Sequence, residues 1–367
     1  MSTATGSDVR GVLSPEARLL LASADRASPD AGDPVAALLE EVREWGKLYG
    51  LALRERAAGA LWELLAGHRD RIPEEFARGL EQAAAIERLR QMQLERRLAE
   101  SLEALDRVGV TPMLLKGAAL LQTCYDDVRE RPMGDIDLLV ESDEAARARD
   151  ALVAADWTWD RERFPEEMYG RHYHLPPLED ARGSGVGLEL HTGLFVPGHP
   201  LDFGPEVLRA RAEAIEVDGH SALVPHPEDH LVYISLHFAW SHALGSAAWR
   251  TFRDAGRLVR SPAFGWDGFV RAAEDAGAGP SAYWTLRLGQ ELTGCEAPDN
   301  VLGKLRPGLP EVVLGRLARN YVLDLSEPEA SCPSVRMRRL LWLVGNRWGQ
   351  DWPGWSFGDR PVRPWDY

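Results

Sequence analysis

The sequence has few cysteines and no long apolar run. Its 367 residues include only Cys124, Cys295 and Cys332, which are far apart and odd in number. This pattern supports neither a disulfide framework nor a C-x-x-C metal site. Because no run of 18 apolar residues and no N-terminal apolar segment of the signal-peptide type is present, we expect no membrane association and predict a cytoplasmic protein.

Positive charge is also scarce. The chain has 42 basic and 57 acidic residues, which gives a net charge of −15. Binding to duplex nucleic acid requires a basic surface that neutralises phosphates, so the composition argues against duplex nucleic acid as a partner and leaves only a local basic pocket open. Hydrophobic residues make up 45% and charged residues 27%, which is typical of a folded soluble protein of two or three compact units.

The most informative stretch is residues 110–140. Two apolar runs, 113–115 and 136–140, are separated by Lys116-Gly117, a short helical pattern and a Pro-Met-Gly turn. Asp135 and Asp137 are two residues apart in the second run, so on a strand they project to one face. Two carboxylates about 6–7 Å apart repel each other, and Mg²⁺, which prefers oxygen ligands, would relieve the repulsion. The alternative is a solvated acidic patch at a strand end.

Neighbouring residues favour the metal hypothesis. Lys116-Gly117 ends the first strand, where the flexible glycine backbone would let a phosphate approach. Arg131 stands just before the acids, and Gly134 gives the turn before Asp135 the backbone freedom of glycine. Lys116 is alternatively a surface lysine of a turn, and Arg131 is alternatively an ion-pair partner of Asp135.

These motifs resemble the uncharacterised nucleotidyltransferase family, a branch of the DNA polymerase beta-like superfamily. The resemblance implies an α+β fold, in which a polymerase beta-like nucleotidyltransferase mixed sheet core is flanked by N-terminal and C-terminal helical regions. The wider superfamily usually has Gly-Ser in the first turn, whereas Ala118 follows Gly117 here, so a phosphate-binding hydroxyl is missing. The residues that carry the resemblance are Leu115-Lys116-Gly117, Tyr125, 131–140 (RPMGDIDLLV), Glu189-Leu190-His191, 225–237 and 249–254.

The resemblance also implies a catalytic set. Asp135, Asp137 and Glu189 would bind two Mg²⁺ ions, and Glu189, nearer the acceptor, would take its proton. An NTP would be the substrate. The further residues expected to bind it or to position the acceptor are Lys116, Gly117, Arg131, His191, His237, Arg250 and Asp254.

Each of the other candidates has a plainer explanation. His191 shares a strand face with Glu189, although a lone histidine is often structural. His226, His230 and His237 suggest zinc, but no H-E-x-x-H motif or cysteine partner accompanies them. Surface ion pairs would explain Arg250 and Asp254 equally well.

Hydrophobic periodicity gives the expected organisation. One long helix, or two with a kink, is predicted between Ile72 and Val108, and a helix with an N-cap between Ser142 and Ala155. Strands are predicted at Trp157–Trp159, Arg171–Leu178 and Gly187–Phe195, with a glycine-rich hairpin at 183–187 before the last. The predicted regions are a disordered N-terminus at 1–11, an N-terminal helical region at 12–108, the nucleotidyltransferase core at 109–225, a C-terminal helical domain at 226–347, and an irregular Trp- and Pro-rich tail at 348–367.

The sequence therefore predicts a Mg²⁺-dependent nucleotidyltransferase that moves a nucleoside monophosphate from an NTP to a small-molecule, peptide or protein acceptor. A bacterial source and a natural-product tailoring role are the expected setting. The alternative is a non-catalytic nucleotide-binding or scaffold protein with a degenerate nucleotidyltransferase fold, for which Ala118 is the support. A transferase acting on tRNA is disfavoured by the net charge.

Overall fold

The chain forms two compact units. The computed structural model describes residues 9–24, 34–127, 130–170, 172–195, 201–242, 244 and 247–326. The first unit, called the helical unit here, comprises Met1–Ala85 and Leu231–Tyr367, and the second, called the sheet unit, comprises Ile86–His230. The helical regions predicted at the two ends of the sequence thus contribute to a single unit.

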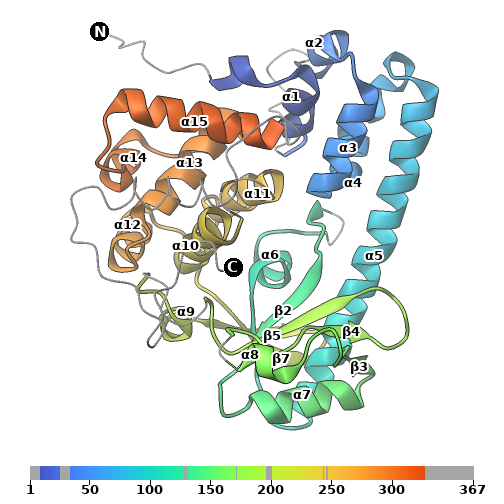
Figure 1. The fold of residues 1–367 in the computed structure, drawn as a ribbon, viewed down its shortest axis with the longest axis vertical. Coiled ribbons are helices and arrows are strands. Elements are labelled where there is room, and N and C mark those ends of the chain that lie inside the picture. Colours follow the sequence, from blue (N-terminus) through green and yellow to red (C-terminus); the bar gives the residue numbers. More distant parts are fainter. Residues whose placement is uncertain are drawn as a thin grey trace. The chain divides into compact units, whose positions relative to one another are not determined.

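The helical unit consists of amphipathic helices. The N-terminus of α1 is capped, because Ser14 Oγ accepts a hydrogen bond from Ala17 N at 3.3 Å and Pro15 is the first helical residue. Its elements are η1 (Val9–Val12), α1 (Pro15–Ala22), α2 (Pro34–Glu41), α3 (Trp45–Glu55), α4 (Ala58–Leu64), η2 (Ala66–Arg71), the first part of α5 (Glu74–Asp106), the last part of α10 (Pro227–Leu236), η4 (His237–Ser241), α11 (Ala248–Leu258), α12 (Trp266–Asp275), α13 (Gly279–Thr293), α14 (Asp299–Leu305) and α15 (Glu311–Ser326) (Figure 1).

The sheet unit is built on one mixed sheet. The described strands are joined in the order β3-β4-β5-β2-β1-β7-β6. The pairs β2–β5 and β1–β7 are parallel and the other neighbours are antiparallel. The elements are β1 (Met113–Leu114), α6 (Lys116–Thr123), β2 (Asp135–Leu139), α7 (Ala145–Ala154), β3 (Trp157–Thr158), α8 (Glu166–Tyr169), β4 (Leu178–Asp180), β5 (Gly187–His191), α9 (Pro205–Ala210), β6 (Glu213–Val217) and β7 (His220–Val224). This α+β arrangement, a mixed sheet core with flanking helices, confirms the predicted fold class.

The long helix predicted between residues 72 and 108 is confirmed as α5, and its second half lies beside β3 and β4 (Figure 1). The guanidinium of Arg97 stacks on Trp157 at 4.4 Å, and its Nε lies 3.4 Å from Asp180 Oδ1. Trp157 Nε1 donates to Ser101 Oγ at 3.0 Å. Since these groups are buried, the contacts fix one edge of the sheet to α5.

The same helix also holds the turn that precedes β2. Gln91 Nε2 donates to the carbonyl of Met133 at 3.1 Å, and Met133 N donates to Gln91 Oε1 at 2.9 Å. One residue earlier, Arg90 donates to the carbonyl of Gly134 at 2.9 Å. Buried backbone groups require partners, and these three bonds supply them just before the strand that carries Asp135 and Asp137.

The predicted strand Arg171–Leu178 is wrong. Arg171 lies outside the described residues, and from residue 172 onward the chain makes only an isolated bridge, His174 with His191, before β4 begins at Leu178. Pro176 and Pro177 lack the N–H groups that a strand ladder needs, which explains the late start. The strand predicted at Gly187–Phe195 forms, but β5 ends at His191.

Two hairpins border the sheet. The predicted one at 183–187 joins β4 to β5, with Gly183 and Gly185 at positive φ. The other joins β6 to β7 through Asp218-Gly219, both at positive φ, and its Asp-Gly turn signal was overlooked in the sequence.

Other local expectations had mixed outcomes. The helix predicted at 142–155 is α7, although Glu144 at its N-cap makes no side-chain capping bond. Disorder was expected up to residue 11, but η1 already covers Val9–Val12. Residues 327–347 of the predicted C-terminal helical domain and the tail at 348–367 lie outside the described residues. In the part of the chain that the structure describes, no helix combines the length and apolarity needed to cross a membrane.

We expect Gln91→Leu to destabilise the protein by about 2–4 kcal/mol, because the apolar side chain would leave the buried N–H and C=O of Met133 without partners. The matched control is Gln93→Leu on the exposed face of the same helix, which should change the free energy of unfolding by less than about 0.5 kcal/mol. Urea-induced unfolding followed by circular dichroism measures both. Equal losses in the two variants would show that Gln91 does not support the turn.

Candidate functional site

The pairing of β2 with β5 brings together the acidic residues of the two motifs. The strands are parallel, and Asp137 is the register partner of Glu189 while Asp135 is opposite Gly187. Side chains alternate along each strand, so Asp137, Glu189 and His191 share one face. Ile136 and Leu138 point to the opposite face, where they are fully buried. Because the apolar side chains of β2 are buried on one face of the sheet, its acidic side chains must lie on the opposite face.

Asp137 is a buried carboxylate with two cationic or donor neighbours. Its side chain is 4% exposed, Lys116 Nζ lies 2.8 Å from Oδ1, and His191 Nε2 lies 2.9 Å from the same oxygen. Burial alone raises the pKa of Asp137, but Lys116 and His191 outweigh this effect and hold the pKa well below its usual range. Asp137 is therefore ionised.

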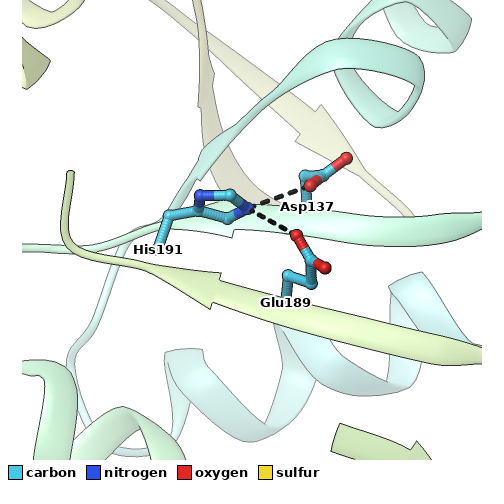
Figure 2. Close-up of side chains that lie close together, drawn as sticks. All are labelled: Asp137, Glu189 and His191. Carbon is cyan, nitrogen blue, oxygen red and sulfur yellow. Dashed lines mark hydrogen bonds and ion pairs between the residues drawn. The ribbon is translucent and has the colours of Figure 1, made fainter. Parts of the chain in front are cut away.

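Glu189 and Asp137 converge on the same imidazole (Figure 2). His191 Nε2 is 3.4 Å from Glu189 Oε2, and one ligand atom from each of the three residues lies within 4.8 Å of the others. Burial lowers the pKa of His191, but hydrogen bonds to both carboxylates raise it above its ordinary value. Burial raises the pKa of Glu189, and the bond from His191 lowers it to a net value below the ordinary one. Two carboxylates and an imidazole in this arrangement are able to hold a metal ion.

Lys116 reaches Asp137 from an unusual backbone conformation. Its φ is 46°, in the left-handed region that non-glycine residues rarely adopt. Next to it, Leu115 N donates to the carbonyl of Asp137 at 3.0 Å, which ties the start of α6 to β2. Such conformations cost about 1–3 kcal/mol and are concentrated at functional sites.

Gly117 is required by close packing. A Cβ at this position would lie 2.8 Å from Met133 Cγ and 3.2 Å from Arg131 Nη1. Arg131 itself is nearly buried, and its Nη1 donates to the carbonyl of Pro132 at 2.8 Å. The absence of a side chain thus lets α6 pack against the turn before β2.

Histidine and tyrosine rings from residues 169–174 line the site beside Glu189. The ring of His174 is centred 5.4 Å and that of Tyr173 5.6 Å from that of His191, and His172 stacks on Tyr173 at 4.3 Å. Thr192 N donates to the carbonyl of Tyr173 at 2.9 Å, which fastens this segment to the end of β5. Burial and His174 lower the pKa of His172 to about 4, so it is neutral near pH 7.

The comparison with protein families decides the classification. The family model described as "Uncharacterised nucleotidyltransferase" matches residues 41–294, which include every residue of the site. The chain belongs to the uncharacterised nucleotidyltransferase family. Searches among curated proteins and among solved structures gave no match. Membership of this family confirms the resemblance seen in the motifs.

The structure gathers four of the residues that the family motifs single out. Asp137 contacts both Lys116 and His191, and His191 also contacts Glu189. Asp135 is exposed at the start of β2, on the same strand face as Asp137. Gly117 and Arg131 lie at the packing contact between α6 and the turn before β2.

The other predicted nucleotide-binding residues of this family member belong to the helical unit. His237 starts η4, and Arg250 and Asp254 lie on α11. Their contact with a nucleotide stays a prediction. His226, His230 and His237 do not form a metal-binding group, since among the described residues only Asp137, Glu189 and His191 do so.

Sequence reasoning missed Tyr169, His172, Tyr173 and His174 as site residues. The signal was the ring-rich segment His172-Tyr173-His174 directly after α8, which was interpreted only as part of a strand. Their place at the site depends on the bridge between His174 and His191, a long-range contact that no local pattern encodes.

Lys116→Met should tighten the binding of Mn²⁺ about tenfold in the absence of nucleotide, which equals about 1.4 kcal/mol. The physical reason is that a divalent ion must otherwise compete with the Lys116 ammonium for Asp137. Isothermal titration with Mn²⁺ measures the change, and Lys304→Met, at a lysine that is half exposed in the helical unit, is the control. Weaker or unchanged Mn²⁺ binding by Lys116→Met would contradict this view of Lys116.

Proposed function

We propose that the protein is a nucleotidyltransferase that moves a nucleoside monophosphate from an NTP to a small-molecule, peptide or protein acceptor, with divalent cations as cofactors. The observation that carries this proposal is the parallel pairing of Asp137 with Glu189, with Lys116 Nζ at 2.8 Å from Asp137. Carboxylates on neighbouring strands beside a lysine suit a site for metal ions and a polyphosphate.

The residues fit divalent cations, because ionised carboxylates meet on one strand face and Asp137 is held in its charged form. Asp135 and Asp137 would hold two divalent ions, and Glu189 would hold the one nearer the acceptor. When bound, the ions would polarise the α-phosphate and neutralise the leaving pyrophosphate.

The protein's own side chains would bind the triphosphate and accept the proton of the acceptor. Lys116 would leave Asp137 to contact the triphosphate, and its four-carbon side chain allows this movement. Arg131 stays a predicted phosphate contact. Glu189 is more exposed than Asp137, with 26% of its side chain accessible, so we assign it the role of accepting the proton of the acceptor hydroxyl.

Charge argues for a compact acceptor. With a net charge of −15 the chain would repel a long polyanion, whereas a small molecule or peptide has no such penalty. From the family resemblance and the Ala- and Arg-rich composition we propose a natural-product tailoring role in a bacterium, and a cytoplasmic location is part of this proposal. The tRNA alternative is disfavoured by the net charge.

A non-catalytic nucleotide-binding protein is the second candidate. Ala118 favours it, because the third residue of α6 is a buried alanine and provides no hydroxyl for a phosphate. The intact set of Asp137, Glu189 and Lys116 favours catalysis, since a degenerate site would have no need to bury an ionised carboxylate.

The test is pyrophosphate release from each of the four NTPs with Mg²⁺ or Mn²⁺, in the presence of cell extract or candidate peptide acceptors. We expect release with at least one NTP and a loss of at least 100-fold in Asp137→Asn, because the amide removes a charged ligand. Asp150→Asn, at an exposed carboxylate of α7, is the control and should keep full activity. No release from any NTP, combined with measurable NTP binding, would favour the non-catalytic candidate.

A further inference from the structure

The three groups that converge in the site are not all oxygen donors. Asp137 and Glu189 offer carboxylate oxygens, but the third atom is Nε2 of His191, whose ring is fully buried and faces both acids (Figure 2). Asp135, the other acid of the D-x-D motif, is exposed and is not a member of this group. The donor set is therefore two oxygens and one imidazole nitrogen.

The spacing of these atoms suits ligands of a single ion. Two ligands at about 2.1 Å from a metal are about 3.0 Å apart at a right angle and about 3.4 Å apart at the tetrahedral angle. Nε2 of His191 lies 2.9 Å from the oxygen of Asp137 and 3.4 Å from that of Glu189. An ion bonded to Nε2 of His191 and to both carboxylates would thus replace the two present hydrogen bonds.

Chemistry then distinguishes between metals. Mg²⁺ is a hard cation that takes oxygen ligands and keeps much of its water. Imidazole together with carboxylates suits Mn²⁺, Fe²⁺, Co²⁺ and Zn²⁺. We propose that Asp137, Glu189 and His191 bind a first-row transition-metal ion in preference to Mg²⁺, with Nε2 of His191 as a direct ligand.

This inference deepens the proposed function, because it assigns one of the two cation positions to a transition metal. The other position, at Asp135 and the triphosphate, keeps an all-oxygen environment suited to Mg²⁺. Metal binding by the three residues does not require an acceptor, so it is measurable even if no transfer is found.

Packing holds the His191 ring in place. Its Nδ1 is buried and has no hydrogen-bond partner among the described residues, so no acceptor orients the ring from behind. Instead the rings of Tyr173 and His174 lie against it, and its backbone forms the bridge to His174. Metal-binding histidines usually have such an acceptor, so the affinity of this site should be lower than that of sites that have one.

The experiment uses the full-length protein loaded with Mn²⁺ alone. Pulsed electron paramagnetic resonance detects modulation from a nitrogen bound to Mn²⁺. We expect ¹⁴N modulation in the unaltered protein, its replacement by ¹⁵N signals after labelling of histidine, and its loss in His191→Gln. His220→Gln, on β7, is the matched control and should keep the signal, because its ring does not belong to the three-residue group.

Isothermal titration supplies the second readout. We expect the unaltered protein to bind Mn²⁺ at least tenfold more tightly than Mg²⁺, and His191→Gln to lose that preference. Because His191 is buried, its variant is used only if circular dichroism shows native folding; otherwise the ¹⁵N-histidine experiment on the unaltered protein decides. Absence of nitrogen modulation, its persistence in natively folded His191→Gln, or equal affinity for the two ions would overturn the proposal.

Discussion

The site depends on the neutralisation of one buried carboxylate. A charge taken out of water costs several kcal/mol unless partners replace its hydration. Asp137 has Lys116 and His191 on the same oxygen, at 2.8 and 2.9 Å, so its charge is kept rather than lost by protonation. The same arrangement explains why a lysine with a left-handed backbone conformation is retained, since its ammonium is the nearest positive group to the acid.

This neutralisation is possible because contacts hold segments of the sheet unit that are far apart in the sequence at fixed positions relative to one another. The Met133 turn before β2 is bonded to Gln91 of α5, the start of α6 is bonded to β2, and β2 is paired along its length with β5. Each bond satisfies a buried backbone group and also sets the position of a functional side chain. Stability and function of the site therefore rest on the same contacts.

Local sequence patterns were enough to predict the parts of the site that lie on single strands. Asp135 with Asp137, and Glu189 with His191, are two residues apart, and strand alternation puts each pair on one face. The long helix α5 followed from a run of strong helix formers. The mixed sheet was predicted because the motifs, in their order, resemble a family that has such a sheet.

What the sequence did not reveal depends on contacts between residues far apart. No local pattern states that β2 neighbours β5, or that Gln91 supports the turn 42 residues later. The segment around His174 was mistaken for a strand although Pro176 and Pro177 follow it. The β6–β7 hairpin was missed although Asp218-Gly219 is a strong turn signal.

The parallel pairing of β2 and β5 has a consequence for how such a chain can change. Parallel neighbours require a long crossover, and here residues 140–186 make it, carrying α7, β3, α8 and β4. Lengthening or shortening surface turns within this crossover leaves the ladder between the two strands intact, at a small entropic cost per added residue. The segments that surround the acids can thus change in length while the acids themselves stay aligned.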